Sequence, residues 1–227
     1  MVLDLAHRIE IVQSRMADAA SRSGRSHDEI TLIAVSKTVN RDVVDEAYGL
    51  GLRQFGENRV QDSVIKYACP LPGDASLHMI GQLQSNKSLA AIRLFDVIQS
   101  VDRSSLIASL EKHASAAGKT IDILLEVNVA GEAQKAGCPV SQIDDLTGRI
   151  LDSPNLHLLG FMTMAPYTST AEEARPVFSE LRALRDRLAE LFDTPFPWLS
   201  MGMTNDFEVA IEEGATHVRV GRAIFSH

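Results

Sequence analysis

The chain has 227 residues and a formal net charge of −8, and 45% of its residues are hydrophobic. This content is enough for a sizeable core and excludes a disordered chain, while the acidic balance without a basic cluster does not indicate nucleic-acid binding. Neither an apolar leader nor an uninterrupted apolar run of about 18 residues is present, so we expect a cytoplasmic protein.

The chain opens with apolar residues at helical spacing, which predict an amphipathic helix over residues 1–23. After it, short apolar runs alternate with helical patterns. The runs predict strands at residues 31–37, 53–57, 77–81, 96–101, 122–128, 157–164, 198–201 and 216–221. The segments between them predict helices at residues 41–50, 59–68, 87–94, 104–117, 141–151, 171–192 and 206–213.

Strict alternation of strand and helix implies parallel pairing and right-handed crossovers. Eight such strands favour the α/β class and a single (β/α)8 TIM barrel over residues 31–227, with 1–23 as an extra covering helix and 1–227 as one domain. An open doubly wound sheet is the alternative. A Gly-x-Gly-x-x-Gly turn after the first strand, which would support that sheet, is not present.

Lys37 ends the first predicted strand and shares a face with Ile33 and Val35. That face points into the interior of a buried strand, where an ammonium is costly unless it is paired or neutralised. An amine in such a place is a nucleophile toward carbonyl compounds. We therefore expect Lys37 to form a Schiff base; the alternative is a loop position from which its side chain bends out to water.

The loops after the last two predicted strands form a frequent phosphate site in barrels. Here Ser200 and Thr204 supply hydroxyl groups, and Gly221 permits close approach of the backbone to a ligand. Alternatively, Thr204 or Asn205 simply caps the next helix. Nearby, Arg219 lies between valines and needs a hydrogen-bond acceptor inside the barrel, which either a ligand or the carboxylate of Glu126 can supply.

Taken together, these segments resemble the pyridoxal phosphate homeostasis protein family. The matching stretches run almost from end to end in the expected order, at residues 34–38, 55–58, 78–87, 126–129, 160–164, 199–206 and 218–225. The resemblance implies a barrel that is similar to the N-terminal domain of alanine racemase and carries pyridoxal 5′-phosphate (PLP).

The resemblance also implies roles for individual residues. Lys37 matches the lysine that forms the internal aldimine, Arg219 matches the arginine that faces the pyridine nitrogen, and Asn58 lines the pocket. The phosphate cradle matches Ser200, Thr204, Gly221 and the amide of Arg222. No catalytic residue and no metal are implied, and Cys69 and Cys138 lack the spacing of metal ligands.

Members of this family are regarded as PLP carriers or buffers without an established reaction. We therefore expect a monomer or weak dimer that buffers PLP in vitamin B6 homeostasis or delivers it to apo PLP-dependent enzymes. The alternative is a PLP-dependent amino-acid racemase-like enzyme, for which Tyr167 is the candidate second acid; a cofactor-free barrel lyase of the class I aldolase kind is another. Lys135 matches a lysine proposed to hold a second cofactor molecule, although a solvated loop lysine is the simpler interpretation.

Overall fold

Strands and helices alternate along the chain from Thr31 onward in a computed structural model, which describes residues 4–132 and 134–226. The strands are β1 (Thr31–Val35), β2 (Gln54–Glu57), β3 (Ser76–Met79), β4 (Val97–Val101), β5 (Ile121–Asn128), β6 (Cys138–Pro139), β7 (Leu156–Met162), β8 (Trp198–Met203) and β9 (His217–Val220). The α-helices are α1 (Leu5–Arg22), α2 (Arg41–Gly49), α3 (Val60–Lys66), α4 (Ser88–Leu94), α5 (Ser104–Ala117), α6 (Ile143–Leu151), α7 (Arg175–Phe192), α8 (Phe207–Glu212) and α9 (Arg222–Phe225). Short 3₁₀ turns lie at His27–Glu29, Ser85–Lys87, Val140–Gln142 and Ala171–Ala174.

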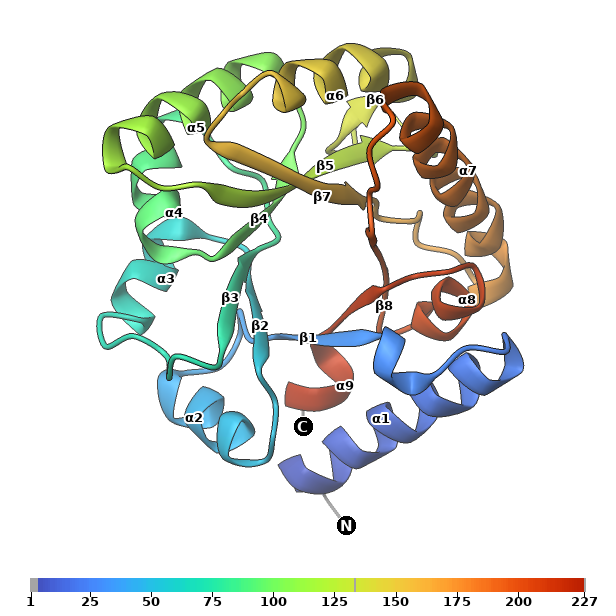
Figure 1. Ribbon diagram of the computed structural model, residues 1–227. Coiled ribbons are helices and arrows are strands. Elements are labelled where there is room, and N and C mark those ends of the chain that lie inside the picture. Colours follow the sequence, from blue (N-terminus) through green and yellow to red (C-terminus); the bar gives the residue numbers. More distant parts are fainter. Residues whose placement is uncertain (1–3, 133, 227) are drawn as a thin grey trace.

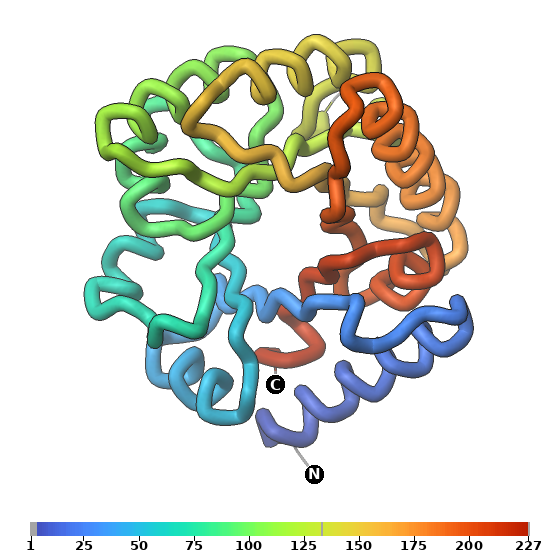
Figure 2. The backbone as a smooth tube through the Cα atoms, in the orientation of Figure 1, coloured from blue at the N-terminus to red at the C-terminus, as the bar shows by residue number. Residues whose placement is uncertain are grey.

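All the strands pair in parallel, and the sheet closes on itself. Its order is β4-β3-β2-β1-β9-β8-β7-β5, and β4 also pairs with β5, so no edge remains between the first and last strands of this order. The closed ring with helices outside it is visible in Figure 1, and Figure 2 shows that early and late segments of the chain meet where β1 lies beside β9. The predicted (β/α)8 barrel is therefore confirmed; the two-residue β6, which pairs with β5, was not predicted.

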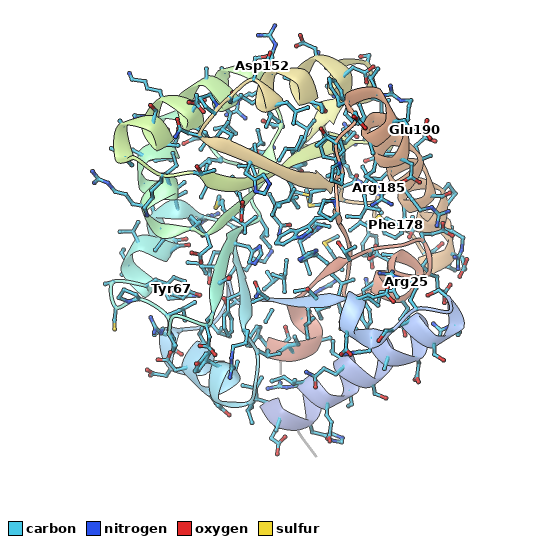
Figure 3. The ribbon with its side chains drawn as sticks, viewed as in Figure 1. Arg25, Tyr67, Asp152, Phe178, Arg185 and Glu190 are labelled. Atoms are coloured by element: carbon cyan, nitrogen blue, oxygen red, sulfur yellow. The ribbon has the colours of Figure 1, made fainter. Side chains whose placement is uncertain are left out.

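Alternation along the strands separates two kinds of buried side chain. Ala34 of β1 belongs to the apolar cluster between the sheet and the helices, together with residues such as Phe178 of α7, which is labelled in Figure 3. The interior of the ring, which side chains fill in Figure 3, contains polar groups as well. Buried Gln99 is hydrogen-bonded there to both His78 and Ser200, which are buried as well. The barrel interior is therefore a packed and partly polar core rather than a pore.

Helix α1 completes the outer layer instead of covering it. The helix after β9, α9, has only four residues, and α1 packs against both α8 and α9 on that side of the ring (Figure 1). Asp4 caps α1 by accepting a hydrogen bond from the His7 amide (2.8 Å), and the apolar face of α1 is buried. No helix among the described residues has the length and apolar character needed to cross a membrane.

Candidate functional site

A cavity of about 1220 Å³ lies at the C-terminal ends of the strands. Of the seven predicted site residues, all but Ser200 line it; they are Lys37, Asn58, Thr204, Arg219, Gly221 and Arg222. These residues are distant in sequence, but parallel strands all end at the same face of a barrel, which brings them together.

Lys37 lies two residues beyond the end of β1, and it lines the cavity together with Val35. Lys37 therefore occupies a loop position, as the alternative expected, although its side chain still borders the cavity. The predicted burial is wrong: β1 ends at Val35, and the Lys37 side chain is exposed to the cavity rather than enclosed by the sheet. Within the described residues, its amine forms no hydrogen bond or ion pair, so it is available to a ligand.

The backbone just before Lys37 is held by a buried ionic network that the sequence analysis did not find. Glu57 Oε1 accepts hydrogen bonds from Ser36 Oγ (2.8 Å), Lys66 Nζ (2.8 Å) and Tyr67 OH (3.0 Å). Lys66 Nζ also donates to the carbonyl oxygen of Ser36 (2.8 Å). Burial, followed by the Glu57 charge, raises the pKa of Tyr67, which is labelled beside α3 in Figure 3. The signal for this network was Glu57 itself, a carboxylate in a buried strand that needed partners.

Arg219 forms part of the cavity floor. Its side chain is buried, and burial lowers its pKa to about 10. Nη1 donates to Ser200 Oγ (2.6 Å) and Nη2 donates to the carbonyl oxygen of Thr163 (2.8 Å). Among the described residues no ion pair joins Arg219 to Glu126, so the acceptors inside the barrel are a hydroxyl and a backbone carbonyl. The guanidinium has five N–H groups, and those not used in these two bonds can meet a ligand.

Ser200 is not at the cavity. We expected β8 to end at residue 201, but it continues to Met203, which places Ser200 deeper in the barrel. Its hydroxyl accepts from Arg219 and donates to Gln99 Oε1 (2.6 Å), and its side chain is fully buried. The expectation that Ser200 contacts a phosphate therefore does not fit the structure.

Thr204 and Asn205 follow β8 directly and line the cavity. The residue that caps α8 is Asp206, whose Oδ1 accepts from the Met203 amide (2.6 Å). Glu208 of α8 accepts hydrogen bonds from Arg15 of α1 (3.0 and 2.8 Å). The predicted capping alternative is therefore wrong, and the Thr204 hydroxyl forms no hydrogen bond within the described residues.

Gly221 lets the end of β9 approach the end of β1. A Cβ atom at this position would lie 3.0 Å from the carbonyl oxygen of Val35 and 3.2 Å from its Cβ, both tighter than ordinary contacts. Any larger residue would therefore push the β9 loop away from the loop that carries Lys37. This glycine, Arg222 and Thr204 all line the cavity.

Glu126 is a buried carboxyl group at the end of β5, which lies opposite β1 in the order of the ring. It lines the cavity, and its Oε1 has no hydrogen-bond partner among the described residues. Burial and then the charge of Asp102 raise the pKa of Glu126 to about 7, while Arg219 acts in the opposite direction.

This raised pKa predicts the pH dependence of stability. Between the ordinary value of 4.5 and about pH 7, the folded state keeps a proton on Glu126 that the unfolded chain releases, so the free energy of unfolding falls as pH rises through this window. We expect Glu126→Gln to remove this loss and to be more stable than the wild type at pH 8, by up to about 3 kcal/mol, but not at pH 4.5. Urea unfolding of the ligand-free proteins at both pH values measures this; an equal difference at the two values would contradict it.

Two other predicted residues also line the cavity. Lys135 Nζ is buried and lies 3.4 Å from Glu132 Oε2. Tyr167 is 88% exposed and lies in the loop that follows β7. His78 is a core histidine, and both of its ring nitrogens take part in hydrogen bonds. Within residues 4–132 and 134–226, no group of three or more His, Cys, Asp or Glu side chains is arranged to hold a metal ion.

Comparison with known proteins agrees with this geometry. Residues 9–227 match the family described as alanine racemase, N-terminal domain. The pyridoxal phosphate homeostasis protein of Aquifex aeolicus is 41% identical over 223 residues, which cover 98% of each chain. That of Escherichia coli K12 is 38% identical over 230 residues, which cover 98% of this chain and 96% of its own. The chain belongs to the pyridoxal phosphate homeostasis protein family.

The solved structures extend the comparison to the fold. PipY of Synechococcus elongatus, solved with PLP bound, superimposes with a TM-score of 0.85 at 33% identity, covering 98% of this chain and 100% of its own. An alanine racemase of Clostridium difficile gives a TM-score of 0.77 at 8% identity, and the match spans 98% of this chain but 56% of the racemase. The second match shows a shared fold. Both the predicted homeostasis family and the predicted likeness to the racemase N-terminal domain are confirmed.

Proposed function

We propose that this chain binds PLP, holds it covalently at Lys37, and buffers the cofactor or delivers it to apo PLP-dependent enzymes. The observation that carries the proposal is the gathering, in one cavity, of the amine of Lys37, the guanidinium of Arg219 and the loop of Thr204. The homeostasis proteins that are 38–41% identical, and PipY with its bound PLP, support it.

The residues of the cavity fit this cofactor. When bound, PLP supplies an aldehyde that reacts reversibly with a primary amine. Lys37 offers such an amine without a competing partner among the described residues. Arg219 can only donate hydrogen bonds, so it suits a ring nitrogen that accepts them. The hydroxyl of Thr204, the backbone of Gly221 and the amide of Arg222 would hold the phosphate, with Asn58 lining the pocket.

The homeostasis role is better supported than the racemase alternative. The close relatives are named for PLP homeostasis and not for a reaction, and the racemase likeness extends only to the fold. We further propose a cytoplasmic protein that acts as one domain over residues 1–227 and as a monomer or weak dimer. Residues 1–3, 133 and 227 of that domain lie outside the described residues. Sedimentation velocity over a range of concentrations tests the oligomeric state.

Reduction with borohydride tests the main proposal. The purified protein is titrated with PLP while its visible absorbance is followed, then reduced, digested and examined by mass spectrometry. We expect a saturable absorbance band that reduction abolishes and one pyridoxyl group on the peptide of Lys37. A label found mainly on Lys135 or Lys66 would place the attachment elsewhere. A protein that gains no band and no label would refute PLP binding.

The Thr204 hydroxyl is expected to contribute to affinity only when the ligand carries a phosphate. A hydrogen bond to a charged group is worth about 1.5–3 kcal/mol, so Thr204→Val should weaken PLP binding by about 10- to 100-fold. Binding of pyridoxal, which has no phosphate, should not change. Thr204→Ser keeps the hydroxyl and serves as the control. Equal weakening of both ligands would mean that the substitution disturbs the fold.

A further inference from the structure

A chain of buried hydrogen bonds runs from the cavity floor through the interior of the barrel. Arg219 Nη1 donates to Ser200 Oγ (2.6 Å), and Ser200 Oγ donates to Gln99 Oε1 (2.6 Å). Gln99 Nε2 then lies 2.9 Å from His78 Nδ1, and His78 Nε2 lies 2.7 Å from Gln54 Oε1. These five residues come from five different strands, β9, β8, β4, β3 and β2, so the chain crosses the ring.

The chemistry of its first member gives the chain a direction. Arg219 has no acceptor atom, so Ser200 must accept from it, and the hydroxyl hydrogen of Ser200 then needs an acceptor of its own. Gln99 Oε1 provides one, which turns the amide nitrogen of Gln99 toward His78. Turning the amide of Gln99 around would leave the buried Ser200 hydrogen without a partner. His78 must therefore accept at Nδ1 and carry its proton on Nε2; burial lowers its pKa to about 4, which keeps it neutral.

Arg219 also has a competing partner, the carboxyl group of Glu126. Both residues line the cavity, each charge shifts the other's titration, and Glu126 Oε1 has no hydrogen-bond partner among the described residues. Above about pH 7, where Glu126 has lost its proton, a guanidinium released from Ser200 would gain a charged acceptor by turning to Glu126. The bond to Ser200 therefore holds Arg219 between neutral acceptors and away from this carboxylate.

We propose that Gln99 is a positioning residue for the cofactor ring: through Ser200 it keeps the Arg219 guanidinium directed at the ring nitrogen and prevents its capture by Glu126. The inference rests on the proposed function, because the ring nitrogen belongs to the bound PLP. It gives Ser200 a role beneath the ring instead of at the phosphate. It also explains why polar Gln99 and His78 lie in the barrel interior, where packing alone would favour apolar residues.

The test compares PLP with its 1-deaza analogue, in which carbon replaces the ring nitrogen while the aldehyde and phosphate remain. We expect Gln99→Leu to weaken PLP binding by about tenfold or more and to leave the analogue unchanged. The double variant Gln99→Leu with Glu126→Gln removes the competing carboxylate and should restore most of the PLP affinity. Thr147→Val removes a polar group elsewhere in the core, a fully buried hydroxyl that has no hydrogen-bond partner among the described residues; it is the control and should affect neither ligand.

Other outcomes overturn the inference. If Gln99→Leu weakens PLP and the analogue equally, Gln99 supports the fold only; if it weakens neither, Arg219 does not depend on the chain. Nitrogen-15 NMR of the ligand-free wild type should show His78 neutral with its proton on Nε2. A proton on Nδ1 would mean that the hydrogen bonds run in the opposite direction, which would refute the inference. A wild type that binds neither ligand would refute the proposed function, while the NMR result still decides the direction of the chain.

Discussion

Replacement of Lys37 by alanine should abolish covalent capture of PLP and leave the protein folded. The side chain is exposed and makes no hydrogen bond or ion pair within the described residues, so its removal costs little stability. The ligand then keeps only its phosphate and ring contacts. Loss of one of two linked anchors lowers overall affinity by a factor of about 100 or more. We expect no borohydride-fixed label on Lys37→Ala and loss of its PLP during gel filtration.

Lys135→Ala is the matched control, because Lys135 is the other primary amine on the cavity wall. It should retain the absorbance band and the label on Lys37. Circular dichroism and urea unfolding confirm that both variants are folded. Full labelling of Lys37→Ala, or loss of labelling in Lys135→Ala, would show that our proposal assigns the attachment to the wrong lysine.

Replacement of Lys66 by methionine should destabilise the barrel by about 3–5 kcal/mol, because it leaves the Glu57 carboxylate buried without its counter-ion. Both side chains are largely buried, and their charged atoms lie 2.8 Å apart. The Ser36 carbonyl also loses a hydrogen bond, so the chain just before Lys37 loosens. Urea unfolding at pH 7 measures the loss, with the slope of the transition checked against the wild type.

Two further variants separate charge burial from simple loss of contacts. Glu57→Gln with Lys66→Met removes both charges and keeps acceptors for Ser36 and Tyr67, so it should recover a large part of the lost stability. Arg149→Met removes one partner of an exposed pair with Asp145 and should change stability little. If Lys66→Met lowered the free energy of unfolding as little as Arg149→Met, the buried pair would contribute nothing measurable to stability.

The barrel could be predicted from sequence because each strand is a short apolar run bounded by a helical pattern. Every long predicted element appears in the structure, and most boundaries agree within a few residues. The differences lie where local pattern is weak. β8 continues through Gly202, which has a φ of 92° that the sequence pattern does not predict, and β6 has two residues.

The cavity was predictable as far as position along a strand decides it. Thr204, Arg219 and Gly221 were placed there because they follow or end strands, and they line it. The burial of two residues was predicted wrongly. Lys37 is less buried than expected because β1 ends two residues earlier than predicted, and Ser200 is more buried because β8 ends two residues later. The partners of Glu57 and the chain through Gln99 depend on contacts between strands, which periodicity within one segment does not encode.

Completion of the helical layer by α1 has a consequence for synthesis. Its apolar residues Leu5, Ile9, Val12 and Met16 leave the ribosome before α8 and α9, which form part of the surface that buries them. Likewise, β1 cannot pair with β9 until β9 has been synthesised. Such pairings between distant segments slow folding. Until translation reaches β9, the nascent chain exposes an apolar helix face and an unpaired strand edge, so chaperone engagement should concentrate on residues 5–35, which include α1 and β1.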